Sequence, residues 1–308
     1  MSIADELARS VPNRPTVCTI GVFDGVHLGH RALIQATIDD ARRRNAASAV
    51  IVLHPHPRSV LAPGPAVPLI TPIEQRLALL RECGADIALP LTFTPELAAL
   101  TPRAFTALLV EHLHMVALVV GPDFALGRDR AGSPEALAAI GRDLGFDVDI
   151  IPLVADTGAK ISSTAVRDAL AGGDVASVAR MLGRSFETNG TVVHGHARGR
   201  LLGYPTANLV PPDGVALPAD GIYATRVHSD GHVYDSATYL GTSPTFDGQE
   251  RLVEVLLFDF DGDLYGEHLR VEWVDKVRGD RKFESAEALQ QQMARDIDTA
   301  KLALSGQS

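Results

Sequence analysis

Hydrophobic positions in the first half of the chain follow two alternating patterns. Short apolar runs with many β-branched residues occupy residues 16–22, 48–53, 86–91, 116–120 and 147–153. Between them, apolar positions recur at helical spacing over residues 30–44, 74–83, 102–114 and 134–144. Short buried strands that alternate with helices are typical of βαβ units. We therefore predict an α/β domain with a parallel sheet, with one helix starting at Thr101-Pro102 and another ending at Gly145.

The pattern changes after about residue 172. Strand-like runs separated by turns follow at residues 191–194, 222–228, 233–240, 252–260 and 264–274, and one helix is expected over residues 285–302. This pattern predicts an antiparallel β-barrel or sandwich with a C-terminal helix. A length of 308 residues suits two domains, which we place at residues 1–184 and 185–308.

The composition is that of an ordinary globular protein, with 46% hydrophobic and 21% charged residues. The net charge is −10, of which residues 1–184 contribute −2 and residues 185–308 contribute −8. A chain this acidic is a poor candidate for nucleic-acid binding, because phosphate neutralisation requires clustered cations. Neither a membrane span nor a signal peptide is apparent, and Cys18 and Cys83 are too few for a disulfide framework. We expect a soluble cytoplasmic protein with reduced thiols.

Lysine is rare in this chain. The four lysines are at positions 160, 276, 282 and 301, and the Walker pattern GxxxxGK[ST] is absent from the sequence. If the first domain handles a nucleoside triphosphate, arginine, histidine, backbone N–H groups and a metal must neutralise the phosphates.

The stretch GVFDGVHLGH, from Gly21 to His30, follows a predicted strand and opens a predicted helix. It therefore lies at the carboxyl edge of the sheet, where α/β domains bind ligands. His27 and His30 share one helix face, and Gly29 lets a phosphate approach the helix N-terminus. This arrangement suits charge stabilisation on an α-phosphate during nucleotidyl transfer. Two surface histidines in a turn, or a metal site, are the alternatives.

Two further segments suit ligand binding at this edge. Ser163, Thr164 and Arg167 in ISSTAVR place hydroxyls at a helix N-cap and a guanidinium on its first turn, although a plain N-cap explains them too. Asp123 and Phe124 lie in GPDFALG, directly after a predicted strand. Phe124 suits a core anchor and a ligand contact equally well.

The second half combines a glycine-rich loop with Pro205, Thr206 and Asn208. The hydroxyl of Thr206 and the amide oxygen of Asn208 are ligands that Mg²⁺ accepts beside ATP phosphates, and a turn with an Asx motif is the alternative. Glu254 interrupts an otherwise apolar strand at residues 252–258. It suits a general base for γ-phosphoryl transfer, or it lies on the solvated face of the strand.

In this order, the motifs resemble those of the prokaryotic bifunctional riboflavin kinase/FMN adenylyltransferase (FAD synthetase) family. The pattern GxFDGxHxGH at residues 21–30, Pro-His-Pro at 55–57, GxDFxxG at 121–127 and ISSTxxR at 161–167 match its nucleotidyltransferase module. GRxLGxPTAN at 199–208, GxxPTF at 241–246, the turn at 259–266 and Glu254 match its riboflavin kinase module. The chain departs from the family pattern at His54, Ala125 and Ser243.

The resemblance implies a Rossmann-like nucleotidyltransferase domain followed by a riboflavin kinase-like β-barrel. The barrel would phosphorylate riboflavin to FMN, and the first domain would adenylylate FMN to FAD, with ATP as co-substrate and Mg²⁺ as cofactor. Catalytic roles would fall to Glu254, His27 and His30, metal binding to Thr206 and Asn208, and substrate binding to Gly21, Phe23, Asp24, Gly29, Asp123, Phe124, Ser163, Thr164, Arg167, Gly199, Arg200, Gly203, Pro205 and Arg278. An enzyme with one silent module and a non-catalytic flavin- or nucleotide-binding regulator are the alternatives.

Overall fold

The structure, a computed structural model, describes residues 2–9, 13–62, 64–152, 155–156, 159–194, 204–245 and 248–306. The chain divides into two compact units, Met1–Ser163 and Thr164–Ser308. Within the described ranges, no helix is long and apolar enough to cross a membrane.

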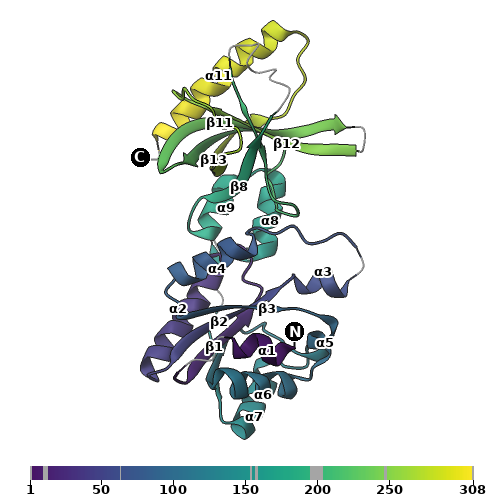
Figure 1. Cartoon of the computed structure of the whole chain (residues 1–308), viewed down its shortest axis with the longest axis vertical. Coiled ribbons are helices and arrows are strands. Elements are labelled where there is room, and N and C mark those ends of the chain that lie inside the picture. The colour runs from purple at the N-terminus through teal and green to yellow at the C-terminus, as the bar shows by residue number, and fades with distance from the viewer. Residues whose placement is uncertain are drawn as a thin grey trace. The chain divides into compact units, whose positions relative to one another are not determined.

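A five-stranded parallel sheet forms the centre of the first unit (Figure 1). Its strand order is β3-β2-β1-β4-β5, and the strands are β1 (Thr16–Gly21), β2 (Ala47–His54), β3 (Ile87–Thr92), β4 (Met115–Val120) and β5 (Asp147–Ile150). The chain moves outward from β1 to β3, and β4 then pairs with the free side of β1. The order therefore reverses between β1 and β4, which opens a crevice at the carboxyl ends of these strands. The predicted parallel α/β fold is confirmed.

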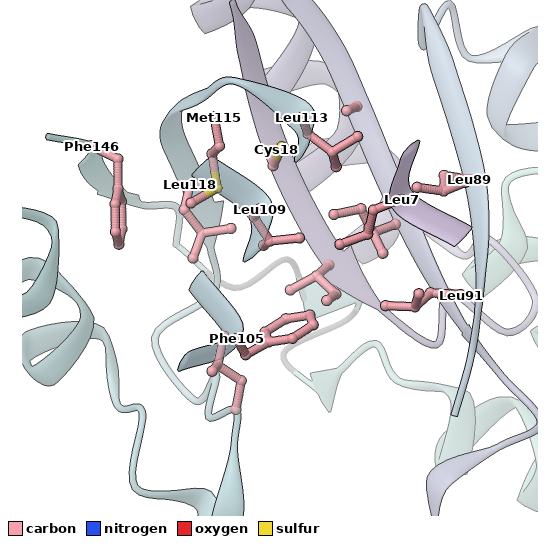
Figure 2. Packing of buried hydrophobic residues seen from close by; sticks show 14 of the residues in the cluster. Leu7, Cys18, Leu89, Leu91, Phe105, Leu109, Leu113, Met115, Leu118 and Phe146 are labelled. Carbon is pink, nitrogen blue, oxygen red and sulfur yellow. The ribbon is translucent and has the colours of Figure 1, made fainter. Parts of the chain in front are cut away.

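Helices cover both faces of this sheet: α1 (Ile3–Ala8), α2 (Leu28–Arg43), α3 (Pro57–Leu61), α4 (Ile73–Glu82), α5 (Pro95–Ala99), α6 (Pro102–Leu113) and α7 (Pro134–Leu144). Cys18 of β1 packs with Leu7 of α1 and Leu109 of α6 on one face (Figure 2). On the other face, Val50 of β2 packs with Ile34 of α2. The alternation of side chains along each strand produces these two apolar layers.

Two predicted helix ends of this unit are also confirmed, whereas α2 begins at Leu28 and not at His30. Thr101 caps α6 by accepting the backbone N–H of Ala104, and Pro102 occupies the first position of the helix. Gly145 ends α7 with a left-handed φ of +80°. Both features follow from local chemistry, since an N-cap needs a side-chain oxygen and a left-handed C-cap favours glycine.

The second unit is a closed antiparallel barrel with a terminal helix. Its strand order is β10-β11-β12-β9-β8-β13, and its elements are β8 (Phe186–Val193), β9 (Ala207–Val210), β10 (Gly221–Ser229), β11 (His232–Thr245), β12 (Gly248–Leu257), β13 (His268–Gly279) and α11 (Ala286–Ser305). Ala300 and Leu304 of α11 pack against Ala224 of β10. Trp273 is fully buried and donates its indole N–H to Thr188 at 2.9 Å. The barrel prediction is confirmed, and the sandwich alternative is wrong.

One local prediction in this unit is wrong. A turn with an Asx motif is the alternative that the sequence leaves open around Thr206 and Asn208, but Ala207 and Asn208 belong to the strand β9. This strand is short and Pro211 and Pro212 follow it, so its sequence has the pattern of a turn. Pairing with β8 and β12 makes it a strand, and such pairing depends on residues that are distant in the sequence.

The helices α8 (Ser163–Gly172) and α9 (Val175–Leu182) follow the first sheet in the sequence. α9 packs against β13 and β8, and Lys276 of β13 donates to the carbonyl of Gly172 at 3.4 Å. These contacts explain why the division between the compact units precedes residue 184, where the sequence pattern predicts a domain boundary.

Candidate functional site

The loop between β1 and α2 has an unusual backbone. Phe23, Gly25 and Val26 have φ angles of +51°, +85° and +42°. A positive φ is ordinary for glycine but unfavourable for phenylalanine, and it is most unfavourable for the β-branched valine. Such strain persists only where surrounding contacts impose it, and it is typical of functional sites.

His27 and His30 begin α2 with their rings stacked, the ring centroids 3.6 Å apart and the planes inclined by 14°. His27 is the N-cap residue, and its Nδ1 accepts the backbone N–H of His30 at 3.2 Å. Because Nδ1 accepts this bond, the proton of a neutral His27 ring is on Nε2, which is then a hydrogen-bond donor. The two predicted histidines therefore lie together, as the sequence indicated.

His30 is held in its neutral form. Burial, followed by the neighbouring His27 and Arg76, lowers the pKa of His30 well below its ordinary value of 6.5. Its Nδ1 is buried and has no hydrogen-bond partner among the described residues. The site therefore presents a neutral imidazole at His30 near pH 7, and a mechanism at this site must not depend on an imidazolium there.

Gly21 and Gly29 occupy positions where a side chain would disturb the rings. A Cβ atom on Gly29 would lie 3.2 Å from the His27 ring, and one on Gly21 would lie 3.2 Å from the Phe23 ring. Phe23 is 1% exposed, and its ring centroid is 5.1 Å from that of His30. Phe23, a predicted substrate contact, is thus placed as a buried support for His30.

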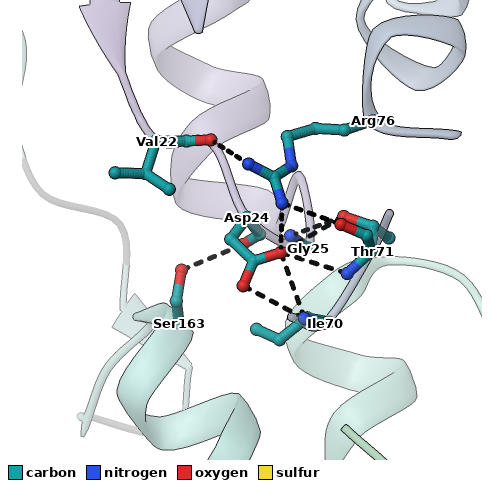
Figure 3. Close-up of polar contacts among 7 residues, drawn as sticks. All are labelled: Val22, Asp24, Gly25, Ile70, Thr71, Arg76 and Ser163. Atoms are coloured by element: carbon teal, nitrogen blue, oxygen red, sulfur yellow. Dashed lines mark hydrogen bonds and ion pairs between the residues drawn. The ribbon is translucent and has the colours of Figure 1, made fainter. Parts of the chain in front are cut away.

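Asp24 is buried behind the loop (Figure 3). Its carboxylate accepts the backbone N–H groups of Ile70 and Thr71 at 3.0–3.1 Å and pairs with Arg76 at 3.0 Å. The hydroxyl of Ser163 donates to the backbone carbonyl of Asp24 at 2.9 Å. Asp24 and Ser163, both predicted to bind substrate, are therefore joined to each other by a hydrogen bond that links the two motifs.

A pocket of about 280 Å³ lies beside the two histidines. Gly29, Gly121, Lys160 and Ser163 also line it. Lys160 contacts the predicted site residue Asp123 at 2.5 Å. Lys160 belongs to β7 (Ala159–Lys160), which pairs with β6 (Ala155–Asp156), and its position at the pocket was not apparent from the sequence. A lysine beside two imidazoles and a helix N-terminus suits a pocket for phosphates.

A larger pocket of about 710 Å³, lined mainly by apolar side chains, lies in the same unit. Gly21, Leu53, Phe105, Phe124 and Ala125 are among its lining residues. Phe124 also packs against the apolar cluster of Figure 2, so it is at once a core residue and a pocket residue. The volume and apolar lining suit a flat aromatic ligand.

In the barrel, strand register brings Asn208 and Glu254 together. Asn208 of β9 lies directly opposite Glu254 of β12, and such cross-strand neighbours have Cβ atoms roughly 4.5–5.5 Å apart. Val253 and Val255, on either side of Glu254, are 1% and 0% exposed. Glu254 therefore lies on the outer face of the strand, where it is half-buried beside Asn208. Thr206 directly precedes β9 and lines a pocket of about 500 Å³ with Asn208.

The surroundings of Glu254 favour a cation. Tyr239 of β11 lies opposite it, and burial together with nearby carboxylates, Asp280 first among them, raises the pKa of Tyr239. Thr206 and Asn208 contribute a hydroxyl and an amide oxygen, which are hard ligands suited to Mg²⁺. No group of three or more His, Cys, Asp or Glu in the described part of the chain could hold a metal. One hydroxyl and one amide oxygen are too few to hold a metal ion alone, and they suit a Mg²⁺ ion that takes its other ligands from ATP and water.

The remaining predicted site residues of the barrel do not share one location. Pro205 is exposed at the pocket that Thr206 lines. Arg278 makes hydrogen bonds of 2.8–3.0 Å to Asp296, so it anchors α11 to β13, and its contact with substrate remains a prediction. Three predicted residues lie outside the described part of the chain: Gly199, Arg200 and Gly203.

Thr164 and Arg167 lie in the first turns of α8. Thr164 is exposed and Arg167 is half-buried, and the contact division assigns both to the second unit. Their binding to a triphosphate remains a prediction.

Comparisons with known proteins agree with the two units. The family model described as FAD synthetase matches residues 10–165, and the one described as riboflavin kinase matches residues 182–304. The chain is 40% identical over 292 residues to the bifunctional riboflavin kinase/FMN adenylyltransferase of Escherichia coli K12, covering 94% of this chain and 93% of that protein. It is 32% identical over 302 residues to the protein of the same description from Bacillus subtilis, covering 97% and 93% of the two chains.

A solved structure has a closely similar fold. It is described as a macrolide-efflux protein from Streptococcus pneumoniae, has a TM-score of 0.89 and 33% identity, and covers 96% of both chains. The two family models and the relatives together span nearly the whole sequence in the same order. This chain therefore belongs to the bifunctional riboflavin kinase/FMN adenylyltransferase family.

Proposed function

We propose that this chain makes both FMN and FAD, with riboflavin kinase activity in residues 185–308 and FMN adenylyltransferase activity in residues 1–184. The observation that carries the proposal is the match of both family models to one chain, each over residues that contain a pocket with suitable polar groups. The substrates are riboflavin, FMN and ATP, and a Mg²⁺ ion accompanies ATP in the barrel. The cytoplasm is the proposed location.

In adenylyl transfer, an oxygen of the FMN phosphate attacks the α-phosphorus of ATP. A new P–O bond forms, the bond to the β-phosphate breaks, and pyrophosphate leaves, so no protein nucleophile is needed. The apolar pocket beside Gly21 would hold the flavin ring, and the pocket beside Lys160 would hold the phosphates. The Nε2–H of His27 would donate to an α-phosphate oxygen as charge develops there, because the Nδ1 of this ring accepts the backbone N–H of His30.

In the barrel, the ribityl 5′-hydroxyl of riboflavin attacks the γ-phosphorus of ATP. The O–H bond breaks, a P–O bond forms, and ADP leaves. Glu254 would take the hydroxyl proton, and Thr206 and Asn208 would hold Mg²⁺, which would reduce the charge repulsion between the phosphate oxygens and the nucleophile. The register of the two strands supports this assignment, because it makes Asn208 the direct cross-strand neighbour of Glu254.

Paired substitutions test the proposal. Glu254→Gln is expected to abolish FMN formation from riboflavin while FAD formation from supplied FMN continues, and His27→Ala is expected to have the reverse effect. Asp298→Asn, on the exposed face of α11, and His112→Ala, on α6, are the matched controls for loss of a charge or a ring. Flavins are separated by chromatography after incubation with ATP and Mg²⁺. Loss of both activities in either variant, with the fold intact, would contradict the assignment of one activity to each half of the chain.

A further inference from the structure

A buried ion pair lies behind the loop that precedes the two histidines. The side chains of Asp24 and Arg76 are 1% and 0% exposed, and neither residue lines the pockets beside Lys160 and Gly21. A fully buried arginine is rare unless its charge is paired and its N–H groups are bonded. The pair therefore has a task that direct substrate contact does not explain.

Arg76 ties three separate segments together (Figure 3). From α4, its guanidinium donates to the backbone carbonyl of Val22 at 2.9 Å and to that of Thr71 at 2.7 Å. It also donates to the carboxylate of Asp24 at 3.0 Å. One side chain thus restrains the exit of β1, the start of the strained loop and the segment before α4, and only a planar fork with several donors can do so.

The remaining bonds of the cluster secure the loop further. The Thr71 hydroxyl accepts the backbone N–H of Gly25 at 3.0 Å, and Asp24 accepts the backbone N–H groups of Ile70 and Thr71. The Ser163 hydroxyl reaches the carbonyl of Asp24. Val22, Asp24 and Gly25 are therefore each hydrogen-bonded to this cluster. Phe23, which has a left-handed φ, lies between two of these restrained residues, and Val26 follows the last of them.

The histidines follow directly from this restrained loop. Val26 precedes His27, and strained φ values of this kind persist only where neighbouring contacts impose them. Arg76 also acts on the ring of His30 through its charge. The titratable groups that act on His30 are His27 and Arg76, and both lower its pKa after burial has done so.

We propose that Arg76 is a positioning residue for adenylyl transfer, which acts through Asp24 and the loop backbone to set the orientation of His27 and His30. The inference rests on the proposed function of this unit. Positioning of this kind affects the rate of the chemical step more than flavin binding, because, apart from the stretch that ends at Val22, the apolar pocket is lined by segments that Arg76 does not bind.

Two variants separate positioning from folding. Arg76→Lys keeps the charge but loses the planar fork, and the double variant Asp24→Asn/Arg76→Gln leaves no unpaired buried charge. Arg81→Lys, an exposed position on α4, is the matched control. For Arg76→Lys we expect a loss of roughly tenfold or more in kcat for FAD formation, with the KM for FMN changed less than about threefold. Riboflavin kinase activity in the same preparation is expected to be unchanged.

A merely structural role predicts a different result. In that case the kcat per folded molecule, with the folded fraction measured by circular dichroism, equals that of the unchanged protein. This result would overturn the proposal, as would a loss confined to the KM for FMN.

A second readout does not depend on FAD formation. The imidazole of His30 is titrated by NMR. The double variant removes the Arg76 charge and is expected to raise the pKa of His30. Arg76→Lys preserves most of the charge effect, so this variant is expected to shift the ring resonances only. Unchanged His27 and His30 resonances in both variants would refute the coupling. If the unchanged protein forms no FAD, the proposed function fails, and the NMR result still decides whether Arg76 orients the histidines.

Discussion

Mild acid is expected to destabilise the first unit through His30. The folded state lowers the pKa of His30 well below 6.5, chiefly because burial disfavours the charged ring. In the unfolded chain this ring titrates near its ordinary value of 6.5. The unfolded state therefore binds a proton that the folded state excludes, and the free energy of unfolding falls as the pH drops below about 6.5.

The magnitude follows from proton linkage. At about pH 5.5, one unit below the unfolded pKa, the unfolded ring is roughly tenfold more protonated than neutral, which favours unfolding by about 1 kcal/mol relative to about pH 7.5. Burial and the Arg76 charge also lower the pKa of His54, which adds a contribution of the same sign. This contribution is smaller, because the charges of Glu74 and Asp24 oppose the shift. The free energy of unfolding is therefore unaffected by these histidines above their unfolded pKa, and it falls progressively as the pH drops below that value.

Urea unfolding at several pH values measures this effect. Trp273 is the single tryptophan and is buried in the barrel, so its fluorescence follows the second unit, while circular dichroism at 222 nm also reports the helices of the first. His30→Gln is the control, because this variant cannot exchange the proton. We expect a smaller loss of stability between the two pH values in the variant than in the unchanged protein. An equal loss in both, or no loss in the unchanged protein, would refute the reasoning.

Three further predictions concern packing, anchoring and phosphate binding. Gly190→Ala places a Cβ 2.6 Å from a backbone carbonyl of the neighbouring strand and is expected to destabilise the barrel by about 1–3 kcal/mol in urea, whereas Gly279→Ala, with open space around it, leaves the transition unchanged. Asp296→Ala removes the partner of the mostly buried Arg278 and is expected to lower the free energy of unfolding by about 3 kcal/mol, and Arg278→Met in the same chain should recover part of that loss. Lys160→Ala is expected to raise the KM for ATP in FAD formation by roughly tenfold while riboflavin kinase kinetics stay the same; equal KM values would show that this lysine does not contact ATP.

Features encoded by local chemistry were predictable from the sequence. Apolar runs and helical spacing were enough for the parallel sheet, Thr101 and Gly145 marked helix ends, and His27 and His30 had to share the start of a helix. In each case the residues that determine the feature lie within a few positions of one another.

Features that depend on distant partners were not predictable. Asp24 was expected to face substrate, but its partners Ile70, Thr71 and Arg76 are 46 to 52 positions away in the sequence. The pairing of Asn208 with Glu254 depends on barrel register, which no local pattern specifies. Lys160 likewise reaches the histidine pocket through the β6–β7 pair and the helix that follows it.

The most direct test of the account is the product profile of the unchanged protein. The purified chain is incubated with riboflavin, ATP and Mg²⁺, and the flavins are separated by chromatography over time. We expect FMN to appear first and FAD to follow, and supplied FMN to be converted to FAD with release of pyrophosphate. FMN alone would mean that the histidine site is inactive. FAD that forms only from supplied FMN would mean that the barrel does not phosphorylate riboflavin. Binding of flavin without either product would contradict the account and favour a flavin-binding regulator.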